Sequence, residues 1–171
     1  MKVIIVSGTP GTGKTTLARE IAKRYNQRYN CKYIDVNRLI RKYDISEGLD
    51  KQRGSKIIDT VKLNKILINL IKKAKFHEKA SLSNNDAIDF LIIDSHLSHY
   101  LPRRYVDLCI ITKTKLKLLE KRLKKRRYSQ EKIRENLDAE IFDICYQEAL
   151  ANKHVIKVID TSKKYNIKTF I

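Results

Sequence analysis

Three of the chain's five glycines fall within six residues, at positions 8, 11 and 13, shortly after the apolar run of residues 3–6. Residues 8–15, called here the glycine loop, read GTPGTGKT and match the Walker A pattern G-x-x-x-x-G-K-[ST]. Glycine lets the backbone curl until its N–H groups point inward, and the N-terminus of a following helix adds partial positive charge there. The segment therefore predicts a strand, a loop that binds phosphate and a helix, in that order.

The residue types of the glycine loop predict how it would hold a nucleoside triphosphate. Lys14 would reach the β- and γ-phosphates as a point charge, and the Thr15 hydroxyl would bind Mg²⁺. The residues expected to contact the nucleotide are Gly11, Thr12, Gly13, Lys14, Thr15 and Thr16. The alternative is a glycine-rich turn that binds nothing.

Short runs rich in isoleucine and valine predict further strands at residues 88–93, 108–111 and 155–159, with a weaker one at 33–36. Such runs are typical of strands buried on both faces in a parallel sheet. Apolar stripes at helical spacing follow the glycine loop, cover residues 57–71 and 116–123, and run through residues 133–145 behind an N-cap at Ser129. The pattern predicts an α/β fold, a P-loop NTPase sandwich with a parallel β-sheet flanked by helices, which binds ligands beyond the carboxyl ends of its strands.

Residues 91–94 form an apolar run that ends in a carboxylate, as a Walker B element does. This end should lie beside the glycine loop, so Asp94 would hold Mg²⁺ directly or through water. Ser95 stands where dedicated ATPases often carry a glutamate that activates water, which favours transfer to a second substrate over hydrolysis. His96 follows on the loop, where its side chain would face the transferred phosphoryl group. The alternatives are an aspartate that caps a turn and an exposed, idle histidine.

Phosphoryl transfer spreads negative charge over the equatorial oxygens of the transition state, so arginines are expected on segments that can close. Residues 113–132 carry ten Lys and Arg against two acids. We interpret residues 125–135 as a short lid in which Arg126 closes over the ATP. The alternative is a solvated basic face.

The polar stretch of residues 35–58 has the position and length of an insertion that binds the phosphoryl acceptor. Its candidate substrate-binding residues are Asp35, Arg38 and Arg41, with Arg41 on the acceptor phosphate, and Arg53 lies in the same stretch. The alternative is that these arginines are ordinary surface residues.

Composition limits the remaining possibilities. The 171 residues predict one domain, and 37 Lys and Arg against 19 Asp and Glu give a net charge of +18, which favours polyanionic partners such as nucleotides or RNA. Three widely spaced cysteines suggest neither a disulfide framework nor a zinc site. The cysteine usage fits a reducing cytoplasm, and no apolar run reaches the length of a membrane span. We therefore expect a soluble, cytoplasmic protein that does not bind a membrane.

These residues resemble those of a known family, the small archaeal and nuclear adenylate kinases classed as isoenzyme 6, which are P-loop nucleoside monophosphate kinases. The likeness covers residues 1 to about 151. It rests on the glycine loop with Thr16, on Asp94-Ser95-His96 as a D-x-H motif, on residues 101–107, on Arg122, Leu123, Arg126 and Tyr128 in the lid, and on residues 135–142 and 148–149. One departure is Arg127, which stands where the family often has a glycine and would stiffen the lid.

The resemblance implies a Mg²⁺-dependent kinase of broad acceptor range that chiefly makes two ADP from ATP and AMP, with a side ATPase activity. It implies Lys14, Asp94, His96 and Arg126 as the catalytic residues. It also implies a role in maturation of the small ribosomal subunit and its 16S rRNA, through the ribosomal protein uS11 and small-subunit precursor RNA.

Two other functions remain open at this point. One is an assembly factor whose ATP binding and hydrolysis switch its grip on a ribosomal protein or rRNA, with kinase turnover incidental. The other is a small-molecule kinase on the same scaffold, such as a shikimate or nucleoside kinase.

Overall fold

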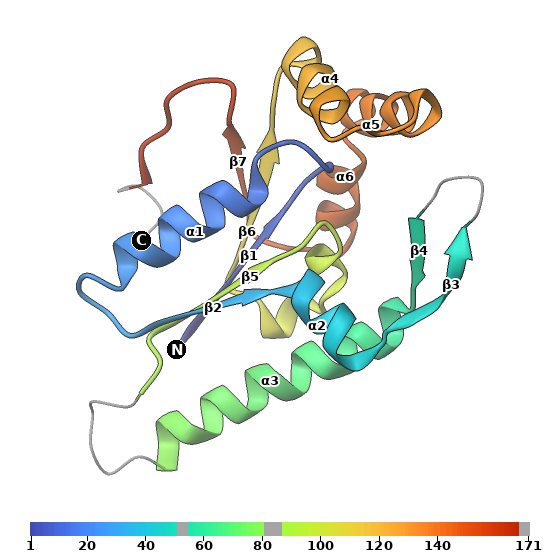
Figure 1. The fold of residues 1–171 in the computed structure, drawn as a ribbon. Coiled ribbons are helices and arrows are strands. Elements are labelled where there is room, and N and C mark those ends of the chain that lie inside the picture. The colour runs from blue at the N-terminus through green and yellow to red at the C-terminus, as the bar shows by residue number, and fades with distance from the viewer. Residues whose placement is uncertain (51–54, 81–86, 168–171) are drawn as a thin grey trace.

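The computed structural model describes residues 1–50, 55–80 and 87–167. Five parallel strands form one sheet in the order β2-β5-β1-β6-β7, with helices on both faces (Figure 1). The strands are β1 (Lys2–Ser7), β2 (Cys31–Asp35), β5 (Phe90–Asp94), β6 (Leu108–Lys113) and β7 (Ile156–Asp160). This arrangement confirms the predicted α/β sandwich. Within the described ranges, no helix has the length and apolar character needed to cross a membrane.

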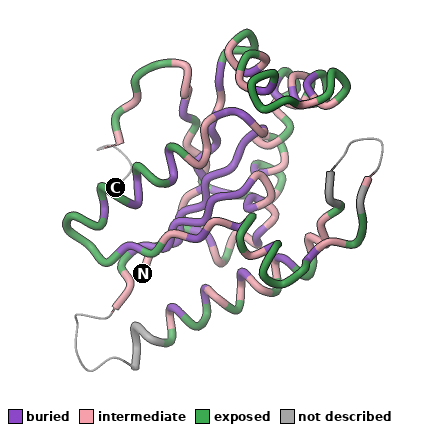
Figure 2. Tube along the Cα trace, viewed as in Figure 1, coloured by how far each residue is buried: buried purple, intermediate pink, exposed green. Residues whose placement is uncertain are grey.

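The side chains of β1 alternate between two cores because successive residues of a strand point to opposite faces of the sheet. Ile4 and Val6 pack with helix α1 (Lys14–Tyr25) on one face. Val3 and Ile5 pack on the other face with helix α3 (Thr60–Ala80) and helix α6 (Ile144–Ala151). Figure 2 shows the buried strands at the centre and the exposed outer surfaces of the helices around them.

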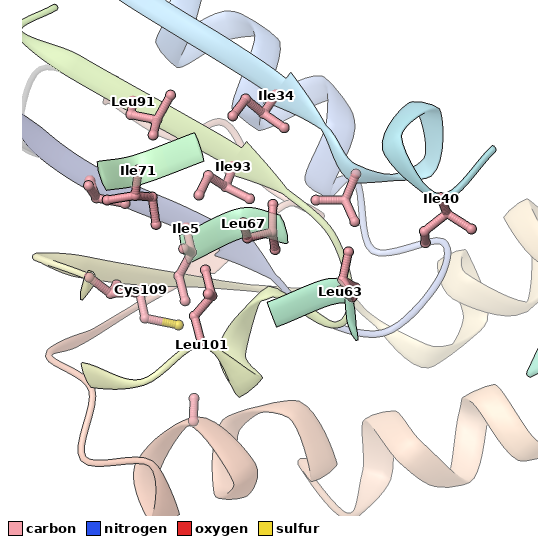
Figure 3. Packing of buried hydrophobic residues seen from close by; sticks show 14 of the residues in the cluster. Ile5, Ile34, Ile40, Leu63, Leu67, Ile71, Leu91, Ile93, Leu101 and Cys109 are labelled. Atoms are coloured by element: carbon pink, nitrogen blue, oxygen red, sulfur yellow. The ribbon is translucent and has the colours of Figure 1, made fainter. Parts of the chain in front are cut away.

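Helix α3 covers its face of the sheet with residues spaced four apart. Leu63, Leu67 and Ile71 are each at most 1% exposed and point toward Ile5, Leu91 and Ile93 of the strands (Figure 3). Residues four apart lie on one side of an α-helix, so this spacing produces one continuous apolar stripe. The packing anchors the segment between β2 and β5 to the sheet.

The helix predicted over residues 57–71 begins later than expected. Ile57 and Ile58 belong to strand β4 (Ser55–Ile58), which pairs antiparallel with β3 (Ser46–Asp50). Helix α3 starts at Thr60, and the Asp59 side chain accepts a hydrogen bond from the Lys62 N–H at 2.8 Å. A carboxylate in this position satisfies a free N–H of the first turn, which explains where the helix begins.

The apolar stripe predicted as one helix over residues 133–145 is two helices. Helix α5 (Gln130–Ile141) ends before Asp143, whose φ of 54° is left-handed, and α6 follows at Ile144. The Asp143 carboxylate forms an ion pair with Lys113. Aspartate tolerates the left-handed region better than most residues, which allows the helix to break here without a glycine. The break leaves little trace in the hydrophobic pattern because apolar residues lie on both sides of it.

The segment predicted as a lid, residues 125–135, contains the end of helix α4 (Leu116–Lys125), the turn after it and the first residues of α5. The two helices pack through Leu119, Leu123 and Ile133. The N-cap predicted at Ser129 is confirmed, because its Oγ accepts a hydrogen bond from the Lys132 N–H at 3.3 Å. Arg127, at the turn between the two helices, has a φ of 57°. This backbone region favours glycine, which is the residue that the family resemblance suggests here.

Replacing Arg127 with glycine should raise the free energy of unfolding by about 1 kcal/mol, because glycine adopts this φ without strain from a Cβ. Urea denaturation measures the change. Lys121→Gly, at an exposed position inside α4, is the matched control and should lower stability by about 1 kcal/mol. Equal losses in the two variants would contradict the assignment of strain to position 127.

Candidate functional site

The glycine loop connects β1 to α1 at the carboxyl edge of the sheet. Its three glycines have left-handed φ values of 137° at Gly8, 97° at Gly11 and 94° at Gly13. A Cβ on Gly8 would lie 2.5 Å from the Thr112 carbonyl oxygen, and one on Gly11 would lie 2.7 Å from the Leu119 Cδ1. Both conformation and space therefore require glycine in the loop.

Hydrogen bonds hold the carbonyl groups of the loop against the surrounding protein. The Thr9 carbonyl accepts from the Thr12 hydroxyl at 2.8 Å and from Lys14 Nζ at 3.0 Å. The Gly11 carbonyl accepts from the Arg122 guanidinium at 3.2 Å, and the Thr12 carbonyl accepts from the Thr161 hydroxyl at 2.6 Å. Because these carbonyl oxygens are hydrogen-bonded to the surrounding protein, the loop is suited to binding an anion, as the motif predicts.

The first pocket, of about 210 Å³, lies against the glycine loop and brings together residues from distant parts of the chain. Of the predicted site residues it is lined by Gly11, Gly13, Lys14, Thr15, Thr16, Asp94, His96 and Arg126. Thr12 differs, because its side chain is fully buried and its hydroxyl bonds the Thr112 hydroxyl at 2.7 Å. The Thr12 side chain therefore supports the loop from behind.

Asp94 ends β5, in register with Val6 of β1 and with Asp35 of β2. Its side chain is 2% exposed, and its Oδ2 accepts a hydrogen bond from the Tyr33 hydroxyl at 2.9 Å. Burial, with the Asp94 charge as a smaller effect, raises the pKa of Tyr33 to about 12, so the phenol keeps its proton. Tyr33 therefore fixes one carboxylate oxygen and orients Asp94 at the pocket wall.

The donor atoms of the first pocket fit Mg²⁺. The Thr15 hydroxyl and the Asp94 carboxylate both line it, and oxygen is the ligand that Mg²⁺ prefers. In the described part of the chain no group of three or more His, Cys, Asp and Glu side chains could hold a metal by itself. Such a small set suits an ion that takes its other ligands from phosphate and water.

Two titratable side chains in the first pocket have lowered pKa values. Burial lowers the pKa of Lys14 from 10.5 to about 8, and the Arg126 charge acts in the same direction. Burial, followed by the Lys14 charge, lowers the pKa of His96 to about 4, so His96 is neutral at pH 7. Each shift reflects the cost of holding positive charge in a buried place beside another cationic group.

The predicted acceptor residues lie on or before helix α2 (Val36–Tyr43). The Asp35 side chain caps this helix, accepting from the Asn37 N–H at 3.0 Å. Arg38 and Arg41 are exposed on α2 and do not line the first pocket, while Arg53 lies outside the described residues. Sequence reasoning missed Asn37, which does line the pocket. Its position just past the end of a strand beside Asp94 was the available signal.

A second pocket, of about 300 Å³, shares Pro10 and His96 with the first. Its other walls come from the glycine loop, the segment after β5 including the 3-10 turn η1 (Ser98–Tyr100), and helices α5 and α6. These lining residues are Thr9, Leu97, His99, Tyr100, Glu135, Asn136, Ala139, Ile144, Cys145 and Glu148. The sequence analysis did not find this pocket.

Comparison with known proteins gives consistent matches over most of the chain. A family model described as an AAA domain matches residues 4–143. A protein of Pyrococcus furiosus with the name "Putative adenylate kinase" is 33% identical over 162 residues, which are 95% of this chain and 76% of that one. The "Adenylate kinase isoenzyme 6 homolog" of Dictyostelium discoideum is 34% identical over 146 residues, covering 85% of this chain and 73% of that one.

Among solved structures, the unliganded sugar kinase of a Janibacter species matches with a TM-score of 0.54. It covers 96% of this chain and 87% of its own, at 18% sequence identity, so it bears on the fold alone. The sequence relatives bear on the family. The chain belongs to the adenylate-kinase-like family of P-loop nucleotide kinases.

Proposed function

We propose that this protein is a nucleoside monophosphate kinase that transfers the γ-phosphoryl group of ATP to AMP. The observation that carries the proposal is the pair of pockets that meet at Pro10 and His96. A triphosphate held by the glycine loop in the first pocket would present its terminal phosphate near these shared residues. A second substrate in the other pocket would then approach the same phosphorus atom, as an in-line transfer requires.

The residues around the first pocket supply the charges that such a transfer needs. Lys14 would bind the β- and γ-phosphates, and Arg126, at the start of the proposed lid of residues 125–135, would close over the ATP. Thr15 and Asp94 would hold Mg²⁺, which would neutralise charge on the β- and γ-oxygens when bound. His96 is neutral at pH 7 and would offer one ring N–H to a phosphoryl oxygen.

With the acceptor nucleoside in the second pocket, its phosphate would face the insertion of residues 35–58, with Asp35, Arg38 and Arg41 as the proposed binding residues. Helix α2 starts directly from the strand end beside Asp94, so a modest inward movement of this helix would bring its arginines toward an acceptor phosphate. Among the described side chains that line the first pocket, Asp94 is the one carboxylate. Without a second carboxylate to activate water, we expect ATP hydrolysis only as a side activity. We also expect the acceptor site to accept nucleoside monophosphates other than AMP.

A second candidate function is favoured by the net charge of +18. Ten Lys and Arg lie between residues 113 and 132, on and beside helix α4. Such a surface suits the phosphate backbone of RNA. We propose that the same protein acts in maturation of the small ribosomal subunit by binding precursor RNA and the ribosomal protein uS11, with ATP turnover changing its grip.

The kinase proposal is tested by incubating MgATP with AMP, CMP, UMP, GMP, shikimate or water and following ADP. AMP should accelerate ADP formation well above the rate with water, and EDTA should abolish it. Lys14→Ala should lower kcat/KM at least about a hundredfold, since about 3 kcal/mol of transition-state stabilisation would be lost. An ADP rate that AMP leaves unchanged, or a loss below threefold in Lys14→Ala, would refute the proposed site.

The lowered pKa of Lys14 predicts a proton linkage. At pH 8 Lys14, with its pKa of about 8, is about half neutral, and polyphosphate charge favours the protonated form. Binding of ADP at pH 8 should therefore take up about half a proton, and its affinity should fall as the pH rises further. Calorimetry in two buffers of different ionisation enthalpy measures the uptake.

Lys14→Arg is the control for this linkage, because guanidinium stays charged throughout this pH range. It should still bind ADP, with the proton uptake at pH 8 lost. Equal uptake by the wild type and by Lys14→Arg would show that another group titrates.

The RNA proposal predicts binding that depends on salt. Affinity for small-subunit precursor RNA should fall at least about tenfold between 50 and 200 mM salt, as two or three phosphate contacts require, and should differ between the ATP and ADP states. Lys117→Glu with Lys121→Glu on α4 should weaken it further. Lys72→Glu with Lys73→Glu, exposed on α3, make the same change in net charge and should do less. An affinity that does not change with salt, or equal losses of affinity in the two double variants, would contradict RNA binding by the basic surface of α4.

A further inference from the structure

A chain of hydrogen bonds runs from the second pocket to the start of the glycine loop. The Glu148 Oε2 lies 2.8 Å from the His99 Nε2, and the His99 Nδ1 lies 2.7 Å from the Ser7 Oγ. Ser7 is the last residue of β1 and immediately precedes Gly8. Three segments that are far apart in sequence are therefore connected through one imidazole ring.

The direction of each hydrogen bond follows from the groups involved. The Glu148 carboxylate is an acceptor, and its other oxygen, Oε1, accepts from the Tyr100 hydroxyl at 2.7 Å. The His99 Nε2 therefore carries the proton. Burial lowers the pKa of His99, which favours the neutral ring, so its Nδ1 accepts a hydrogen bond from the Ser7 hydroxyl.

The two ends of this chain have very different exposure. Ser7 and His99 are 0% and 1% exposed, whereas the Glu148 side chain is 36% exposed and lines the second pocket. The backbone at His99 is also held, since its carbonyl oxygen lies 2.9 Å from the His154 Nε2. A ligand can reach Glu148, and the hydrogen-bonded path from Glu148 to the buried Ser7 runs through His99.

The second pocket also limits what such a ligand presents to Glu148. Its described lining contains Glu135 and Glu148 and no Lys or Arg, so this wall suits a neutral group that donates hydrogen bonds, such as a ribose hydroxyl or a base amino group. A donor of this kind would compete with His99 and Tyr100 for the carboxylate oxygens. The hydrogen bond that orients His99 would change, and so would the hold of His99 on Ser7.

We propose that Glu148, His99 and Ser7 couple occupancy of the second pocket to the geometry of the glycine loop, with His99 as a positioning residue. This inference rests on the proposed function, in which the acceptor nucleoside occupies the second pocket and ATP occupies the first. Such coupling would make binding of the two substrates cooperative, because the acceptor would change the geometry of the loop that holds the ATP phosphates.

Calorimetry with a non-hydrolysable ATP analogue, in the presence and absence of AMP, tests the coupling. In the wild type AMP should change the affinity for the analogue by at least about fivefold, the lower end of typical coupling between sites. Ser7→Ala removes the hydroxyl that ends the chain and should reduce this factor below about twofold. Glu148→Gln should reduce it from the other end, since an amide cannot accept as two carboxylate oxygens do.

Ser98→Ala is the matched control. Ser98 is another fully buried serine near the loop. Its hydroxyl donates to the Ser95 carbonyl at 2.8 Å and to the Val6 carbonyl at 3.4 Å, and it is not part of the Glu148–His99–Ser7 hydrogen bonds. It should leave the AMP effect intact, and thermal melts of both serine variants report any general loss of stability.

The outcomes separate the two proposals. No stimulation of ADP formation by AMP in the wild type would refute the proposed function itself. Stimulation by AMP with a coupling factor that stays the same in Ser7→Ala, or falls equally in Ser98→Ala, would overturn the coupling while leaving the kinase proposal standing. A wild-type factor below twofold would overturn it as well.

Discussion

The fit of the glycine loop against its neighbours is the constraint on which the site depends. β1 lies between β5 and β6, so the loop that leaves it is flanked by Asp94 on one side and by Thr112 on the other. Gly8 packs against the Thr112 backbone, and Gly11 packs against Leu119 of α4. The loop can take this path only with left-handed residues that lack a Cβ, and the same fit connects the loop to the helix that leads into the proposed lid.

The sheet and its two cores were predictable because their signals are local. Each central strand is apolar on both faces, and each covering helix carries its own stripe, so the sequence pattern required no knowledge of long-range contacts. The hairpin β3–β4 was missed because it lacks such a local apolar pattern. Strand β3 contains Ser46, Glu47 and Gly48, and Ile57 of β4 is 49% exposed, so the described residues do not alternate clearly between apolar and polar. The break at Asp143 was missed because apolar residues continue on both sides of it.

The two pockets show the same difference between local sequence signals and arrangements that only the fold creates. The glycine loop is a contiguous motif, and Asp94 and His96 follow a strand that the pattern predicts, so all three could be placed from sequence. The second pocket could not, because its walls come from four segments and its polar members, such as His99 and Glu148, are isolated in the sequence. Their significance arises only when the fold brings them within 2.8 Å of each other. Arg38 and Arg41 show the converse case, in which residue type and position suggested a role while the described pocket does not include them.

The lowered pKa values in the first pocket have a common physical origin. Lys14, Arg126 and His96 line the same pocket, and burial together with neighbouring positive charge makes the protonated forms of Lys14 and His96 less stable there than in water. A polyphosphate would reverse this, because its charge stabilises the protonated lysine and the arginine together. A site that is unfavourable for its own cations therefore has the electrostatic character that favours a highly charged anion, and still more a transition state with charge spread over its equatorial oxygens. Cations fixed in this way need little rearrangement when that charge develops, provided that the glycine loop beneath them keeps its shape.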